Sequence, residues 1–542
     1  MNKVTREPGL PSRVEIYDTT LRDGAQLEGI SLTVDDKLRI AEQLDWLGVD
    51  YIEAGWPGAN PKDDELFRRA RTELHLDSSV LVAFGMTRRV KGKVDSDDTL
   101  RHLVEAGTST VCIVGKTWDY HVTEALDTTL EEAVAMVTDS ISYLKDLNRA
   151  VLFDAEHFFD GYRANAEFAL RVLEGAVQSG VDHLVLCDTN GGSLPHNVEE
   201  TVRAVVAYFG ADVKIGVHLH DDTGCGVANA LAGVRGGATQ VQGTINGYGE
   251  RTGNCNLTTI IPNLTLKMGI ETLPPDRMER LTPVAHHVAE LVNMSLNPQA
   301  PYVGSSAFAH KAGLHVSAII KRPDAYEHTP PETVGNGTRF VMSELAGKST
   351  ILLKAKELGI DLDGPTVNQV VNTLKQLEHK GYHFEVADAS LEMLMRRTAG
   401  WEPNWFRVES FRVITDDASP TTSAGVAPDG VTTEATIKVW VGEERIIATE
   451  EGNGPVNALD RALRRALAGR YPALDRLHLT DYKVRVLDTQ NGTGAITRVL
   501  LDTTDGEESW TTIGVSENII EASWQALSDS ILYGLLRDEI RG

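Results

Sequence analysis

Short apolar runs alternate with longer amphipathic stretches from about residue 12 to residue 270. The runs are rich in Val, Ile and Leu, and the stretches between them have helical spacing, with Thr33 and Thr223 where N-caps are expected. Parallel strands need such crossover helices, so the repeat predicts a parallel sheet. The expected strands are residues 13–18, 49–55, 79–85, 110–115, 150–156, 183–189, 214–220 and 239–245. Eight units predict a (β/α)8 barrel, and a doubly wound sheet is the alternative.

Alternation within two of these strands indicates where a site would lie, because successive side chains point to opposite faces. In the fifth strand, Asp154 and Glu156 share a face with Leu152. In the eighth strand, polar side chains face inward and apolar ones face the helices: Gln240, Gln242 and Thr244 against Val241 and Ile245. An interior that turns polar towards the strand ends predicts a site at the C-terminal mouth of the barrel.

The pattern changes twice after the barrel. Mainly helical sequence follows to about residue 400, with helices expected near 283–294, 343–358, 365–381 and 388–397. Beyond Trp401 six stretches alternate with period two, and helices at about 455–468 and 518–536 follow the two groups of strands. This predicts a duplicated α+β domain. The expected domains are therefore 1–275, a barrel; 276–400, helical linker subdomains; and 401–542, the α+β domain.

The composition restricts the classes of partner that the protein can bind. Acidic residues outnumber basic ones by 78 to 52, which gives a net charge of −26 and disfavours nucleic acid and anionic lipid surfaces. The four cysteines include no CxxC pair, and there is no N-terminal signal or stretch approaching the roughly 18 apolar residues of a membrane span. We expect a cytoplasmic protein without nucleic-acid or membrane partners.

Two motifs carry charged or metal-binding groups at strand ends. DTTLRDG, residues 18–24, places Arg22 beside Asp23 after the first strand, where they could bind an anion and a metal or form only a surface salt bridge. HLHDD places His218 and His220 at i and i+2 of a strand, so both imidazoles project from one face. The alternative for the histidines is a buried, hydrogen-bonded pair.

Two further features are less specific. NGYGERTGNCN, residues 246–256, follows the eighth strand, and its Asn254 offers an oxygen to a hard or borderline metal ion. Glu156, at the end of the fifth strand, is a base, an orienting residue or half of an ion pair, and its position alone does not distinguish these roles.

The motifs along the chain are, in order, DTTLRDG, the strand ending at Glu156, CDTNGG, HLHDDTGCGVANAL and NGYGERTGN. With them the chain strongly resembles the 2-isopropylmalate, homocitrate and citramalate synthases, which are metal-dependent TIM-barrel enzymes. The resemblance continues through FAHKAGLHVSAI and GNGPVNALDRAL and so covers nearly the whole chain. EAGWPGANPKD, residues 53–63, is most similar to the citramalate synthase branch. One departure is that this chain reads HVSA from His315 where isopropylmalate synthases usually read HQDG.

The resemblance implies the site residues. They are Asp23, His218 and His220 as metal ligands with Asn254 as a fourth, Arg22 as activating cation, Thr189 as contact for the keto-acid carboxylate, and Glu156, His315 and Tyr326 as catalytic residues. The cofactor would be a divalent ion: magnesium, manganese or zinc.

The resemblance also implies an activity. The activity is the condensation of acetyl-CoA with pyruvate to citramalate and CoA in isoleucine biosynthesis. The resemblance further implies a homodimer whose C-terminal regulatory domain binds isoleucine. Three alternatives remain: a 2-isopropylmalate synthase acting on 2-oxoisovalerate, a lyase of the same barrel family that cleaves a hydroxyacyl-CoA, and a non-catalytic amino-acid sensor.

Overall fold

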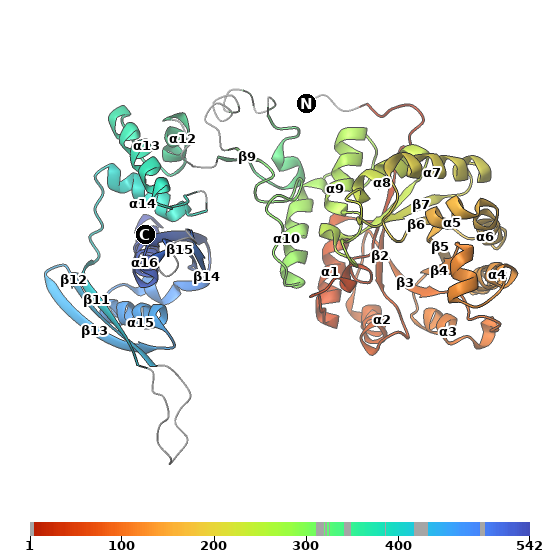
Figure 1. Ribbon diagram of the computed structural model, residues 1–542, viewed down its shortest axis with the longest axis horizontal. Helices are drawn as coiled ribbons and strands as arrows, with labels where there is room; N and C mark the ends of the chain where they lie inside the picture. The colour runs from red at the N-terminus through yellow and green to blue at the C-terminus, as the bar shows by residue number, and fades with distance from the viewer. Residues whose placement is uncertain are drawn as a thin grey trace, which may run out of the picture. The chain divides into compact units, whose positions relative to one another are not determined.

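The computed structural model describes residues 5–310, 319, 322, 324, 326–340, 348–384, 386–416, 432–487 and 494–541 (Figure 1). The chain forms two compact units. The first runs to Phe308 and includes Glu327–Thr338, and the second comprises Ala309–Tyr326 and the chain from Arg339 onward. The division into three domains expected from the sequence stays a prediction.

The first unit is a closed barrel of eight parallel strands in sequence order, with β1 hydrogen-bonded to β8. The predicted (β/α)8 barrel is therefore confirmed, and the doubly wound sheet is excluded. The strands are β1 (Glu15–Asp18), β2 (Tyr51–Gly55), β3 (Val80–Met86), β4 (Thr110–Lys116), β5 (Ala150–Glu156), β6 (His183–Asp188), β7 (Ile215–Leu219) and β8 (Gln240–Gly243).

Helices lie around these strands (Figure 1). They are α1 (Val34–Leu47), α2 (Pro61–Glu73), α3 (Asp98–Glu105), α4 (Leu130–Asp146), α5 (Phe158–Ala164), α6 (Ala166–Gln178), α7 (Pro195–Phe209) and α8 (Gly226–Gly236). Two more helices, α9 (Leu257–Pro262) and α10 (Leu281–Leu291), follow the barrel. No helix in the described ranges is both long and apolar enough to cross a membrane.

One of the two predicted N-caps is correct. Thr33 caps α1 through a reciprocal capping box with Asp36. The prediction for Thr223 was wrong, because α8 begins three residues later, at Gly226. There the amide of Gly226 donates to the Asp221 carboxylate at 2.6 Å, while the Thr223 hydroxyl donates to a carbonyl of another loop.

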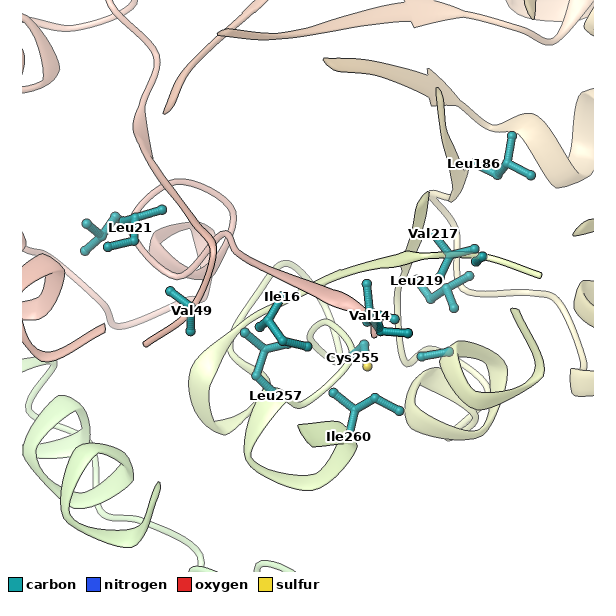
Figure 2. Packing of buried hydrophobic residues seen from close by; sticks show 14 of the residues in the cluster. Val14, Ile16, Leu21, Val49, Leu186, Val217, Leu219, Cys255, Leu257 and Ile260 are labelled. Carbon is teal, nitrogen blue, oxygen red and sulfur yellow. The ribbon is translucent and has the colours of Figure 1, made fainter. Parts of the chain in front are cut away.

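Two layers of packing explain the alternation in the strands. Outward-facing side chains such as Ile16 and Val217 join the core between strands and helices, where Ile16 lies beside Leu257 of α9 (Figure 2). The barrel interior holds a separate small cluster: Tyr17, Val82, Phe84, Cys112 and Leu152. Val241 and Ile245 belong to the outer core, as predicted, and the polar residues of β8 are fully buried.

The second unit contains the predicted duplication. Its helices α12 (Lys348–Glu357), α13 (Gly364–His379) and α14 (Asp388–Thr398) precede two antiparallel three-stranded sheets, each followed by a helix. The repeats are β11 (Arg407–Asp416), β12 (Thr432–Val441), β13 (Glu444–Gly452) and α15 (Pro455–Leu467), then β14 (His478–Val486), β15 (Thr497–Thr504), β16 (Ser509–Ser516) and α16 (Ile519–Arg541). Apolar residues of α15 and α16 share one core with both sheets.

Candidate active site at the barrel mouth

The turn after β1 is held by buried hydrogen bonds that position Arg22 and Asp23. The Asp18 carboxylate accepts hydrogen bonds from the amide and the hydroxyl of Thr20, both at 2.8 Å. The Thr20 hydroxyl in turn accepts the amide of Ile245 at 2.9 Å, which ties the turn to the end of β8. The two functional side chains therefore extend from a constrained turn at the mouth of the barrel.

The carboxylate of Asp23 meets the two imidazoles at the end of β7. Asp23 Oδ2 lies 3.3 Å from His218 Nε2 and 3.8 Å from His220 Nε2, and the two Nε2 atoms are 3.3 Å apart. All three residues are buried. One carboxylate oxygen and two imidazole nitrogens at such separations form a group that can hold a divalent ion.

Asn254 lies beside this group. It forms an antiparallel bridge with His220, and its amide nitrogen donates to the carbonyl of Tyr248 at 3.2 Å. Its side-chain oxygen is buried and has no hydrogen-bond partner among the described residues. A buried acceptor without a partner is unfavourable by about 1–3 kcal/mol. This oxygen therefore fits a fourth ligand of the ion better than a purely structural role.

The electrostatics of Asp23 and His220 favour metal binding, whereas for His218 burial is outweighed by the hydrogen bond and charge of Asp23, which raise the pKa, so this imidazole must release a proton when a metal binds. Burial opposes ionisation of Asp23, but the charge of Arg22 and the hydrogen bond with His218 hold the Asp23 pKa well below its usual range. Burial, followed by the charge of His218, lowers the pKa of His220 to about 4. At neutral pH Asp23 is therefore ionised and His220 is neutral, which are the states that bind metals.

Arg22 is a buried cation rather than half of a surface salt bridge. Its guanidinium Nε is 2.6 Å from Glu53 Oε1, its side chain is only 14% exposed, and it stacks over the ring of Phe84 at 3.9 Å. Glu53 is also bound by the Tyr17 hydroxyl at 2.6 Å. Glu53 was not predicted from the sequence as part of the site, although it is a carboxylate inside the apolar strand β2.

A cavity of about 290 Å³ opens onto these groups. Its polar lining includes both histidines, both carboxylates of β5 and the residues that flank them: Arg22, Asp23, Asp154, Glu156, Thr189, His218 and His220. Aromatic and aliphatic side chains complete the wall, including Trp56, Phe84, Met86 and Val114. A small, mainly apolar cavity with a few converging polar groups is typical of a small-molecule site.

Glu156 and Thr189 lie on neighbouring strand ends of the cavity. Glu156 Oε2 is 2.5 Å from the ammonium group of Lys116, which is its partner in the register of β4 and β5. The ion pair considered from the sequence therefore exists, with a partner that the sequence analysis did not identify. The Thr189 hydroxyl accepts the backbone amide of His157 at 2.9 Å, which fixes its position.

The two remaining predicted residues come from the segment after the barrel. His315 lies outside the described residues. Tyr326 belongs to the second unit, where its side chain is 45% exposed. Their catalytic role stays a prediction.

Comparison with known proteins identifies the family. Three family models match consecutive segments: HMGL-like at residues 13–284, homocitrate synthase post-HMGL domain-like at 302–382, and LeuA allosteric (dimerisation) domain at 385–535. (R)-citramalate synthases of Aquifex aeolicus and Streptomyces coelicolor are 49% and 52% identical to the chain, over 98% of it and 100% and 99% of their own lengths. The chain belongs to the (R)-citramalate synthase family.

A 2-isopropylmalate synthase has lower sequence identity to this chain. The 2-isopropylmalate synthase of Methanocaldococcus jannaschii is 30% identical over 98% of this chain and 96% of its own. The family resemblance seen in the sequence motifs is thus confirmed, and the citramalate synthases match it more strongly than this 2-isopropylmalate synthase does.

Proposed function

We propose that this member of the (R)-citramalate synthase family condenses acetyl-CoA with pyruvate and that water then hydrolyses the resulting thioester, giving (R)-citramalate and CoA in a route to isoleucine. The relatives that share about half of its residues over their full lengths carry this name. The structural observation that carries the proposal is the convergence of Asp23, His218 and His220 with Arg22 on one cavity.

The ligand group would be completed by Asn254, and magnesium, manganese and zinc all suit its oxygen and nitrogen atoms. When bound, the ion would supply Lewis-acid polarisation of the 2-oxo acid, which can chelate it through a carboxylate and a keto oxygen. With these four ligands, both substrate oxygens can bind if the ion takes six ligands.

The chain's other residues then have separate tasks. The Arg22 guanidinium, fixed by Glu53, stabilises the negative charge that grows on the keto oxygen as the new carbon–carbon bond forms. The Thr189 hydroxyl binds the carboxylate of pyruvate. Glu156 removes a proton from the methyl group of acetyl-CoA, with His315 and Tyr326 assisting the proton transfer. For Glu156 to take up this proton, substrate must displace the Lys116 ammonium group from it.

A substrate comparison tests the proposal. Thiol release from acetyl-CoA is measured with pyruvate and with 2-oxoisovalerate at matched concentrations of metal. We expect kcat/KM to favour pyruvate by at least about 10-fold, because 2-oxoisovalerate needs room for two further methyl groups and one methylene changes binding by about 1–3 kcal/mol. Preference for 2-oxoisovalerate would assign the chain to 2-isopropylmalate synthesis, and cleavage of a hydroxyacyl-CoA without condensation would make it a lyase.

The C-terminal match supports a proposal for regulation. Residues 385–535 match an allosteric (dimerisation) domain, so we assign the chain a homodimeric state and an isoleucine site in this domain. Isoleucine is expected to inhibit turnover of the full-length enzyme at concentrations where leucine and valine do not, and light scattering should give twice the chain mass of 59.1 kDa. Equal inhibition by the three amino acids would refute the assigned effector, and absence of turnover together with selective binding of isoleucine would favour the sensor alternative.

A further inference from the structure

Gln242 connects a metal ligand to a carboxylate on the far side of the barrel. It is fully buried on β8, and its Oε1 lies 2.9 Å from Nδ1 of His218, its register partner on β7. Its Nε2 donates to Asp154 Oδ1, on β5, at 3.2 Å. The three side chains thus form a continuous hydrogen-bonded path inside the barrel.

The chemistry of the three groups fixes the direction of this path. The Gln242 amide turns its NH2 end towards Asp154, whose Oδ1 accepts the hydrogen bond. The carbonyl end then faces His218, and it can only accept. Nδ1 of His218 must therefore carry the hydrogen. Nε2 lies 3.3 Å from Asp23 Oδ2, and because Nδ1 is committed to Gln242, Nε2 is the nitrogen that would bind a metal ion when its hydrogen bond to Asp23 is replaced.

The backbone makes this arrangement rigid. His218 and Gln242 are opposite one another in the β7–β8 ladder, and Gln242 also pairs with Tyr17 in β1. Both partners of the amide are buried, so water does not readily replace either hydrogen bond. A change of side chain at Gln242 therefore removes the orientation of the imidazole without moving the strand that carries it.

We propose that Gln242 is a positioning residue for the metal centre and that Asp154 acts through it, together holding His218 as the Nε2-bonded ligand. Histidines that bind metals commonly donate their second ring N–H to an acceptor, and loss of that acceptor weakens metal binding by about 10–100-fold. This inference rests on the proposed metal-dependent function. It adds to that function Gln242 and Asp154, which do not bind the metal ion themselves.

The chain offers a matched control. Gln240 is the same residue type on the same strand, also fully buried, and neither of its amide atoms has a hydrogen-bond partner among the described residues. Gln240→Met and Gln242→Met therefore remove a buried amide of equal size at neighbouring inward positions, and only the second breaks the path to His218.

The test is calorimetric titration of Mn²⁺ into metal-stripped, full-length enzyme, with circular dichroism as a check of folding. Gln242→Met is expected to raise the Mn²⁺ dissociation constant about 10–100-fold, with kcat largely recovered at saturating Mn²⁺, whereas Gln240→Met leaves the dissociation constant within about twofold of wild type. Equal dissociation constants for the two variants would overturn the inference.

A second variant protects the test against misfolding of the first. Asp154→Asn keeps the shape and the hydrogen-bonding capacity of the side chain, but its amide no longer dictates which end of Gln242 faces His218. We expect a smaller but measurable rise in the Mn²⁺ dissociation constant, and an unchanged constant would remove Asp154 from the path. If wild-type enzyme itself binds no Mn²⁺, the proposed metal centre fails; if it binds and the variants match it, only this inference fails.

Discussion

Replacing His220 with alanine is expected to lower kcat/KM by about 10³-fold or more, because Lewis-acid catalysis contributes several kcal/mol and each 1.4 kcal/mol is a factor of ten. The variant should still fold, since His220 lies at the barrel mouth and its Nδ1 has no hydrogen-bond partner in the described structure. Steady-state kinetics and metal content by mass spectrometry check the two parts of this expectation.

His183→Ala is the matched control for this variant. His183 is equally buried on β6, but its imidazole Nε2 contacts Glu15 at 2.7 Å, and neither residue lines the active-site cavity. Its loss should reduce thermal stability while leaving metal content and kcat/KM within a few-fold of wild type. Metal-dependent turnover retained in His220→Ala would remove His220 from the site.

Arg22→Gln should have the second-largest effect. Removing a single group that stabilises a developing oxyanion typically lowers kcat by about 10²–10³-fold, whereas the KM for pyruvate should change less. The substitution also leaves Glu53 buried without its cation, and breaking a buried ion pair in this way costs about 3–5 kcal/mol of folding free energy. Kinetics and urea unfolding measure the two effects on the same sample.

A second buried arginine and a double variant separate catalysis from stability. Arg88→Gln breaks the ion pairs of Arg88 with Glu132 and Asp139, all outside the cavity lining, and should lower stability without lowering kcat. Adding Glu53→Gln to Arg22→Gln should recover part of the stability but none of the rate. Unchanged kcat in Arg22→Gln would contradict the oxyanion role.

The barrel was predictable because its strands are short, apolar and separated by amphipathic helices. The fifth predicted strand, residues 150–156, coincides with β5. The eighth was predicted one residue too long at its start and two too long at its end, where Thr244 pairs with Asn256 and Ile245 begins a turn. Such endings depend on contacts with residues elsewhere in the chain, and period-two alternation carries no information about them.

Residues of the candidate site were missed for the same reason, namely that contacts with distant parts of the chain are not visible in the sequence pattern. The convergence of Asp23, His218 and His220 was predictable because the C-terminal ends of parallel barrel strands meet at one mouth. Lys116 and Gln242 were missed, although Gln242 was correctly placed facing inward. Their roles come from cross-strand partners, Glu156 and His218, and a single sequence does not show which strands and registers are neighbours.

We propose that one divalent ion, held by Asp23, His218 and His220, binds the 2-oxo acid beside Arg22. Anomalous X-ray diffraction from crystals grown with Mn²⁺ and pyruvate tests it most directly. We expect a single strong peak within about 2.3 Å of the three ligand atoms, with pyruvate bound to it through two oxygens and Arg22 next to the keto oxygen. A peak elsewhere in the barrel, or pyruvate bound away from these side chains, would contradict the account.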